Sequence, residues 1–155
     1  MIKAIENFVG RFNTKISLNE NLLTKKRNRF FLLNKTLKKL SVKDFFYVGI
    51  YLGKMKKGRF FPSVNLLRMI AETKANKVIV DKKTEWLFIC GRDIFKKGIK
   101  KVAGSKNKGD YTLILNVYNE CLGYGKILHD LDRPRKGVVI KNILDIGDFL
   151  RRESK

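Results

Sequence analysis

The sequence predicts an α+β protein with two domains: a small α/β N-terminal domain over residues 1–75 and a β-barrel-like C-terminal domain with a terminal helix over residues 76–155. Three observations predict this fold. Apolar residues recur at helical spacing in the first half, short apolar strand patterns dominate after Val78, and glycines stand where those patterns break. A chain of 155 residues with 44% hydrophobic content is long enough for one domain or two small ones.

The N-terminal half mixes helical and strand patterns. Ile2, Ile5, Val9 and Phe12 follow helical spacing, and Pro62 with Ser63 is typical of a helix start. In order, we expect a helix over 2–12, a hairpin with a charged turn over 22–33, a short helix capped by Asn34, a buried strand over 45–52 ending at Gly53, a basic loop over 54–59, and a helix from Ser63 to about Ala75.

The C-terminal half is expected to consist mostly of short strands. Leu113, Leu115 and Val117 alternate along one strand face, and both Cys90 and Cys121 lie in apolar segments, which predicts buried, reduced thiols. The expected elements are strands over 78–80 and 86–89 around a turn at 81–84, a helix-like stretch over 93–97, strands over 110–117, 122–127 and 137–140, and a terminal helix over 142–152.

Charge points to a polyanionic partner. The chain has 35 Lys and Arg against 14 Asp and Glu, a net charge of +21, and residues 1–75 alone hold 17 basic and 4 acidic residues. Because the excess lies in both halves, a basic tail on a neutral body is excluded. Thermophilic surface charge normally brings Glu with Lys, and only six Glu are present. Nucleic acid is therefore the expected partner, with a Lys-rich genomic composition as the alternative.

The glycines of the C-terminal half carry a resemblance to a known module. The stretch Leu87 to Ile127, with Gly91, Ile94, Gly98-Ile99, Lys108-Gly-Asp110 and Gly123-x-Gly125, resembles the PUA domain, a compact RNA-binding fold. Glycine permits tight turns and close backbone approach at such positions.

A wider resemblance reaches into the first half of the chain. Three runs are similar to the Nip-seven family of large (60S-type) ribosomal subunit biogenesis proteins: Phe60-Phe-Pro-Ser-Val-Asn-Leu-Leu67, Leu122-Gly-Tyr-Gly125 and Asp145-Ile-Gly-Asp-Phe-Leu-Arg-Arg-Glu153. This resemblance implies a monomeric, non-catalytic factor that binds precursor ribosomal RNA and pre-ribosomal particle proteins. It also implies a link to the RNA exosome in archaeal members. An archaeal member is expected in the cytoplasm and a eukaryotic one in the nucleolus.

Seven basic residues are the candidate RNA contacts. The resemblance implies contacts through the terminal helix, where Arg151, Arg152 and Lys155 stand. Two further basic runs supply Lys97 and Lys100, which flank Gly98, and Arg135 and Lys136. The alternative for every one of them is a solvated turn or helix end. If they bind RNA, charge reversal at Arg151 and Arg152 should weaken binding and leave folding intact.

The sequence shows no motif that is typical of a catalytic site. His129 is the single histidine, two cysteines and one histidine do not make a metal spacing, and Gly123-x-Gly125 lacks the third glycine of a dinucleotide loop. We therefore expect no catalysis, no cofactor, no metal, and no membrane span. Two other readings stay open: a translation-related PUA protein that binds tRNA or the small ribosomal subunit, and an RNA-modifying enzyme, for which residues 1–75 are too few.

Overall fold

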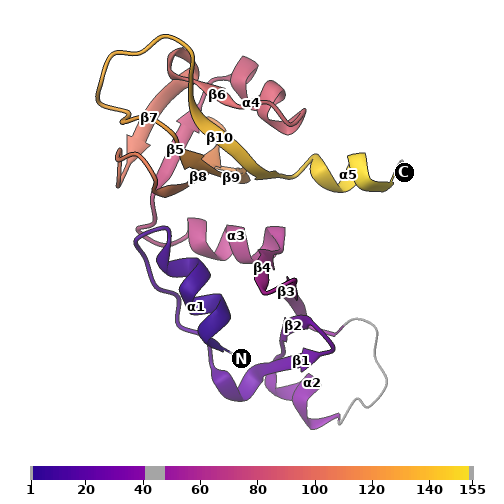
Figure 1. The fold of residues 1–155 in the computed structure, drawn as a ribbon. Helices are drawn as coiled ribbons and strands as arrows, with labels where there is room; N and C mark the ends of the chain where they lie inside the picture. Colours follow the sequence, from indigo (N-terminus) through magenta and orange to yellow (C-terminus); the bar gives the residue numbers. More distant parts are fainter. Residues whose placement is uncertain (1, 41–47, 154–155) are drawn as a thin grey trace.

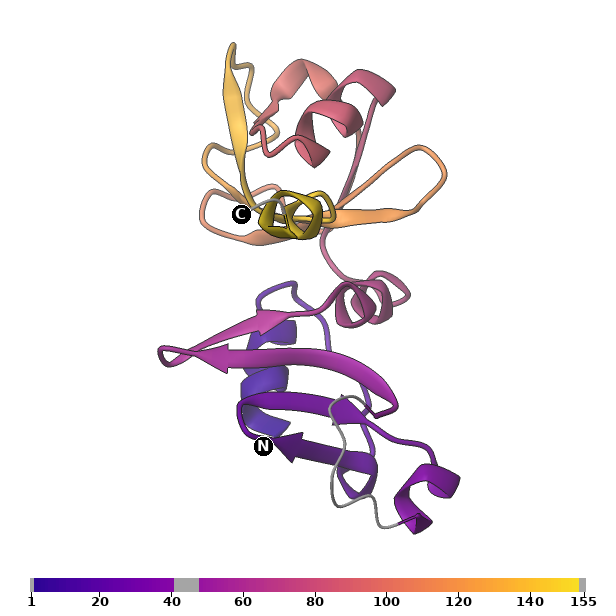
Figure 2. The ribbon, with the colours of Figure 1, turned by 90° about the vertical axis from the view of Figure 1, so that its right-hand side faces the viewer.

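The computed structural model describes residues 2–40 and 48–153 and has two sheets, one in each half of the chain (Figure 1). The N-terminal sheet has four antiparallel strands in the order β1-β2-β3-β4, and the C-terminal sheet has six in the order β6-β10-β9-β8-β5-β7. The curled six-stranded sheet lies above the N-terminal half in Figures 1 and 2, with α3 between the two sheets and α1 alongside the four-stranded sheet. The predicted α+β class is therefore confirmed.

The N-terminal half follows the predicted order of elements. Asn34 accepts a hydrogen bond from the Leu37 N–H at 2.8 Å, and Ser63 accepts one from the Leu66 N–H at 3.1 Å, so both predicted helix caps are confirmed. The elements are α1 (Ile2–Gly10), η1 (Glu20–Leu22), β1 (Leu23–Lys26), β2 (Arg29–Leu32), α2 (Lys35–Lys39), β3 (Ile50–Lys56), β4 (Arg59–Pro62) and α3 (Val64–Ala71).

Two expectations for this half are wrong. The basic stretch 54–59 is a β-hairpin instead of a loop, because β3 continues through Gly53 and pairs with β4 from Gly53↔Pro62 to Lys56↔Arg59. The exposed lysines of this stretch made it look like a loop, although Met55 and Phe60 pack against the core from the hairpin's inner face. The helix that begins after Ser63 ends at Ala71, short of Ala75. Part of the predicted strand over 45–52 lies outside the described residues.

The C-terminal half builds a half-barrel closed at one end by a helix. Phe88 of α4 is fully buried in the barrel core, and α4 contacts β6, β9 and β10. The elements are β5 (Lys77–Val80), α4 (Lys82–Ile89), β6 (Ile94–Phe95), η2 (Lys96–Gly98), β7 (Ile99–Ala103), β8 (Tyr111–Leu115), β9 (Cys121–Ile127), β10 (Val138–Asp145) and α5 (Asp148–Glu153).

A glycine in β9 permits the close contact between β9 and β10 that the sequence predicts. Gly123 has φ +147°, and a Cβ at this position would stand 2.0 Å from the Leu144 carbonyl oxygen. Gly98 has a different role from the tight turn expected of it. Its φ is not positive, and its Cα instead packs so closely on α4 that a Cβ would stand 2.0 Å from Thr84 Oγ1.

Three expectations for this half are corrected. Residues 86–89 belong to α4 and not to a strand, because the Asp81 carboxylate caps the helix by accepting from the Thr84 N–H at 2.7 Å. Residues 93–97 form β6 and the start of η2. The segment 142–152 is not one helix, since β10 runs to Asp145 and α5 begins at Asp148. The run 86–89 has only four residues, and an apolar run of that length fits either a strand or a buried helix turn. Periodicity alone therefore could not assign this run.

The cysteines differ in their surroundings. Both are free thiols, but Cys90, at the end of α4, is exposed, so its predicted burial is wrong. Cys121 is buried as predicted, and burial raises the pKa of its thiol to about 11.

The two halves share one hydrophobic core. Strand β8 uses both faces: Ile114 points into the barrel, whereas Leu113 and Leu115 pack outward against the N-terminal half. Their partners include Phe12, just after α1, and Leu67 of α3. The predicted boundary between residues 75 and 76 stays a prediction, and the chain there is buried, with Ala75 and Asn76 only 3% and 1% exposed.

Candidate nucleic-acid interface

Two of the predicted basic runs meet at one end of the barrel. Strand β6 pairs with β10 through Phe95↔Val138, and the Lys96 N–H donates to the Gly137 carbonyl at 3.3 Å. This pairing sets η2 beside the loop that precedes β10, although forty residues separate them in sequence. Lys97 and Lys136 are both exposed there.

Lys100 and Arg135 complete this group, which we call the basic turns: Lys97, Lys100, Arg135 and Lys136. Lys100 follows η2 at an irregularity where β7 pairs with β5, and its side chain is exposed. Its charge lies close enough to Asp81 to help lower the pKa of that carboxyl, although the cap bonds from Thr84 contribute more. In the part of the chain that the structure describes, none of these four side chains forms an ion pair, so their positive charges stay available to a ligand.

Sequence reasoning missed a neighbouring loop with the same sign of charge. The Lys108 N–H donates to Asp130 Oδ1 at 2.8 Å, and the Lys106 carbonyl accepts from the Leu131 N–H at 2.8 Å. Both lysine side chains are exposed beside the loop that carries Arg135. The run Lys106-Asn-Lys108 was visible in the sequence, but its contact with the loop after β9 is tertiary.

The positive charges of this surface affect the pKa of the single histidine, His129. Partial burial lowers the pKa of His129, the positive charges of Arg135 and Lys108 lower it further, and Asp130 opposes them. His129 is therefore biased toward its neutral form within a positive surface.

The terminal helix holds its arginine differently. Arg151 donates from Nη1 to the Ile89 carbonyl at 2.6 Å and from Nη2 to Asp145 Oδ2 at 2.8 Å. Asp145 is 2% exposed, Asn142 also donates to its Oδ2, and its Oδ1 has no hydrogen-bond partner within the described residues. The bond to Asp145 raises the pKa of Arg151. Arg151 thus fastens α5 to the end of α4, with its side chain 43% exposed.

The other two residues of the predicted terminal-helix site are less defined. The backbone of Arg152 lies in α5, and Lys155 lies outside the described residues. Strand β10 separates α5 from the basic turns (Figure 1). At about 3.3 Å per residue, the two ends of this strand are roughly 23 Å apart. The six predicted residues that the structure describes therefore form two groups, and the contact of all seven with RNA stays a prediction.

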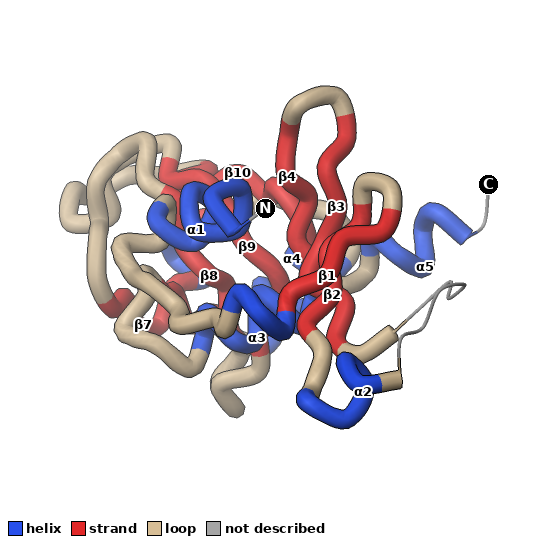
Figure 3. Tube along the Cα trace, turned by 90° about the horizontal axis from the view of Figure 1, so that it is seen from below, coloured by secondary structure: helices blue, strands red, loops and turns tan. Residues whose placement is uncertain are grey.

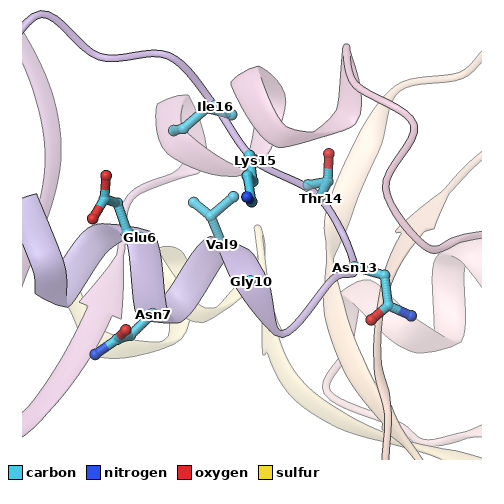
Figure 4. A pocket seen from close by; sticks show the side chains of 8 residues that line it. All are labelled: Glu6, Asn7, Val9, Gly10, Asn13, Thr14, Lys15 and Ile16. Carbon is cyan, nitrogen blue, oxygen red and sulfur yellow. The ribbon is translucent and has the colours of Figure 1, made fainter.

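The hollow beside α1 in Figure 4 is lined by both apolar and polar residues, and two of them, Glu6 and Lys15, carry opposite charges. Across residues 2–40 and 48–153, no three His, Cys, Asp or Glu side chains gather in a way that would hold a metal ion. Over the same residues, none of the helices has the length and apolar character needed to cross a bilayer.

Comparison with solved structures shows the same fold in archaeal proteins. A conserved PUA domain protein from Thermoplasma acidophilum aligns with a TM-score of 0.62 and 22% identity, over 97% of this chain and 92% of that one. A PUA domain from Aeropyrum pernix, solved as a tartrate complex, aligns with a TM-score of 0.62 and 18% identity, over 97% and 85%. At these identities the likeness concerns the fold.

Sequence comparison gives the family. A UPF0113 protein from Archaeoglobus fulgidus is 28% identical over 111 residues, which cover 69% of this chain and 63% of that protein's length. The profile of the first C-terminal domain of the RsmF rRNA methyltransferase matches residues 7–68. The profile of the UPF0113 PUA domain matches residues 76–154, half of the chain. The protein therefore belongs to the UPF0113 PUA domain family.

Proposed function

We propose that this protein binds RNA through the basic turns of its PUA domain. One observation carries the proposal: the fold brings Lys97, Lys100, Arg135 and Lys136 from two distant segments to one exposed end of the barrel, and none of these side chains forms an ion pair with another described residue. Lysine and arginine on a rigid turn bind phosphates by charge, and the backbone turns fix their spacing. The net charge of +21 supplies long-range attraction to the same partner.

The RNA that we propose is a precursor of large-subunit ribosomal RNA. Support comes from the similarity of residues 60–67, 122–125 and 145–153 to the Nip-seven family, and from the match of residues 7–68 to a domain of an rRNA methyltransferase. In this proposal the protein acts as a monomeric, cytoplasmic assembly factor without catalysis. It holds an irregular RNA segment, contacts pre-ribosomal proteins, and presents or shields the RNA during processing, with the exosome as a candidate partner.

The shared core between the halves suits such a role. Because α1 and α3 pack on β8 and β9, the N-terminal half is held in place relative to the PUA domain. A partner protein bound to the first half would then be positioned relative to RNA bound on the second.

In-cell crosslinking followed by sequencing of the bound RNA tests this proposal. We expect reads concentrated on large-subunit precursor RNA, and we expect them to fall when Lys97, Arg135 and Lys136 are changed to Glu. A matched control reverses three exposed cations of the N-terminal half, Arg27, Lys35 and Lys39, with the same change in net charge. Reads concentrated on tRNA or small-subunit RNA would instead favour a translation-related role and contradict the precursor assignment.

A further inference from the structure

A second surface of interest is a cleft between the two halves of the molecule. It is about 650 Å³ in volume and lies between α1, the β3–β4 hairpin and the outer face of the six-stranded sheet. Figure 3 shows α1 and the hairpin on the same side of β9 and β10. Its position is set by the shared core, because Phe8 of α1 packs edge-on against Tyr124 of β9 with ring centroids 5.4 Å apart.

An arginine is held beside an aromatic ring inside this cleft by two contacts with the same tyrosine. The guanidinium carbon of Arg11 lies 5.1 Å from the ring centroid of Tyr111, and Nη1 donates to the Tyr111 hydroxyl at 3.1 Å. Arg11 is exposed, so its guanidinium stays accessible to a ligand while it contacts the tyrosine. Two separate interactions therefore pre-orient a cation that would otherwise sample many rotamers.

The aromatic support behind Arg11 is rigid. Tyr111 packs at a tilt on Tyr124 with centroids 5.7 Å apart and meets Phe12 edge-on at 6.1 Å. Burial raises the pKa of Tyr124 to about 12, so its phenol stays neutral at physiological pH. The chain of aromatic contacts from the core outward ends at the exposed guanidinium of Arg11, on which a further aromatic ring, such as a base, could pack.

The rest of the lining suits an unpaired nucleotide. Arg59 adds a second positive charge, and none of the residues lining the cleft is Asp or Glu. Phe61 and Ile143 are apolar but 37% and 38% exposed at the same cleft. Flat cationic and apolar surfaces combined with uncompensated charge are the features by which proteins bind single-stranded nucleic acid.

We propose that this interdomain cleft binds an unpaired nucleotide of single-stranded RNA, with the base stacked on Arg11 and the backbone phosphate drawn to Arg59. The proposal rests on the RNA-binding function above. It adds a second RNA-binding site, on the outer face of the six-stranded sheet. It also gives the N-terminal half a direct part in RNA recognition, because the turn after α1 supplies Arg11 and the β3–β4 hairpin supplies Arg59.

Binding of a labelled single-stranded RNA, compared with an abasic oligonucleotide of the same length, separates the two sites. Both ligands have the same phosphates, so the basic turns bind them alike, while the cleft gains only from bases. We expect the base-bearing RNA to bind about tenfold more tightly. Arg11→Lys keeps the charge and removes the stacking plane, so it should abolish most of that difference and leave affinity for the abasic strand unchanged.

Two control variants and one independent measurement complete the test. Arg27→Lys, an exposed arginine outside the cleft, and Tyr118→Ala, a tyrosine 79% exposed elsewhere, should keep the tenfold difference. Photocrosslinking of 4-thiouridine RNA to the unmodified protein should label peptides containing Arg11 or Phe61. Crosslinks confined to the basic turns, or an Arg11→Lys protein that retains the full preference for bases, would overturn the cleft proposal. Absence of binding to either oligonucleotide at low salt would overturn the RNA-binding function itself.

Discussion

The junction between the two halves depends on the side chain of Asn76, and its removal gives a quantitative prediction. Asn76 is 1% exposed. Its Nδ2 donates to the Tyr111 carbonyl at 3.0 Å, and its Oδ1 accepts from the Ser105 N–H at 3.0 Å and from Asn13 Nδ2 at 3.4 Å. One amide thus joins the loop after α1, the turn after β7 and the first residue of β8.

The expected loss follows from the partners left behind. Asn76→Ala removes two well-formed hydrogen bonds. It leaves the Ser105 N–H and the Tyr111 carbonyl without these partners at a partly buried position. Each such group costs about 1–3 kcal/mol when it loses its partner, so we expect a loss of about 2–4 kcal/mol in the free energy of unfolding. For a protein of this size that corresponds to a fall in Tm of about 5–12 °C.

Equilibrium urea unfolding measures the loss, and amide hydrogen exchange locates it. We expect the Ser105 amide to exchange much faster in the Asn76→Ala protein, because that amide donates to the deleted side chain. Asn107→Ala, at an exposed position in the same loop, should change stability by less than about 0.5 kcal/mol. A loss below about 0.5 kcal/mol in Asn76→Ala, with Ser105 exchange unchanged, would refute the reasoning.

Three further predictions concern single contacts. Gly123→Ala should cost at least about 3 kcal/mol in unfolding free energy, since its methyl meets the Leu144 carbonyl at 2.0 Å, and a variant that unfolds like the wild type would contradict this. Asp81→Ala should cost about 1 kcal/mol at pH 7 in thermal unfolding by loss of the helix cap. The cap bonds lower the folded-state pKa of Asp81 below its ordinary 3.8, so its contribution is present above that pH and lost as pH falls through the lower folded value. Asp81→Asn, which keeps an acceptor, should lose less stability than the wild type over that acidic window, and equal losses would be contrary evidence. Arg151→Glu should loosen α5 and destabilise the protein, detectable as faster exchange of the α5 amides, and unaltered exchange would show that the bond to Asp145 is dispensable.

The Arg151 prediction replaces one made from sequence. Charge reversal at Arg151 and Arg152 was expected to leave folding intact, which requires a solvated side chain. In the structure Arg151 instead bonds a buried carboxylate and the last turn of α4, so a reversed charge would face Asp145. The sequence gives no sign of the contact between Arg151 and α4, because the Ile89 carbonyl that accepts this hydrogen bond lies 62 positions earlier in the chain.

Local chemistry made other features predictable. Asn34 and Ser63 begin helices because their side chains cap nearby N–H groups, and that signal lies within four residues. Gly123 was recognisable because a glycine inside an apolar strand marks close backbone approach. The assignment of 86–89 to a strand failed because a four-residue apolar run has no decisive period, and the cap at Asp81 was read as a turn.

Tertiary contacts explain what the sequence did not reveal about the candidate sites. Lys97 and Lys136 meet because β6 pairs with β10, and Arg11 meets Tyr111 across 100 residues of sequence. The charge of each run was readable, but its neighbours depend on sheet order. For the same reason, the sequence did not show that the candidate RNA contacts within the described residues lie at two ends of β10.

The salt dependence of RNA affinity, measured by fluorescence anisotropy for the wild type and for a protein with Lys97, Arg135 and Lys136 changed to Glu, tests the central claim most directly. With four to six phosphates neutralised, the logarithm of the wild-type affinity should fall with the logarithm of salt concentration at a slope of about −3 to −4. Loss of three contacts should weaken binding and reduce the magnitude of that slope by about 2. The control reversal at Arg27, Lys35 and Lys39 should keep the wild-type slope. Equal slopes in the wild type and the basic-turn variant would contradict the claim that RNA binds there.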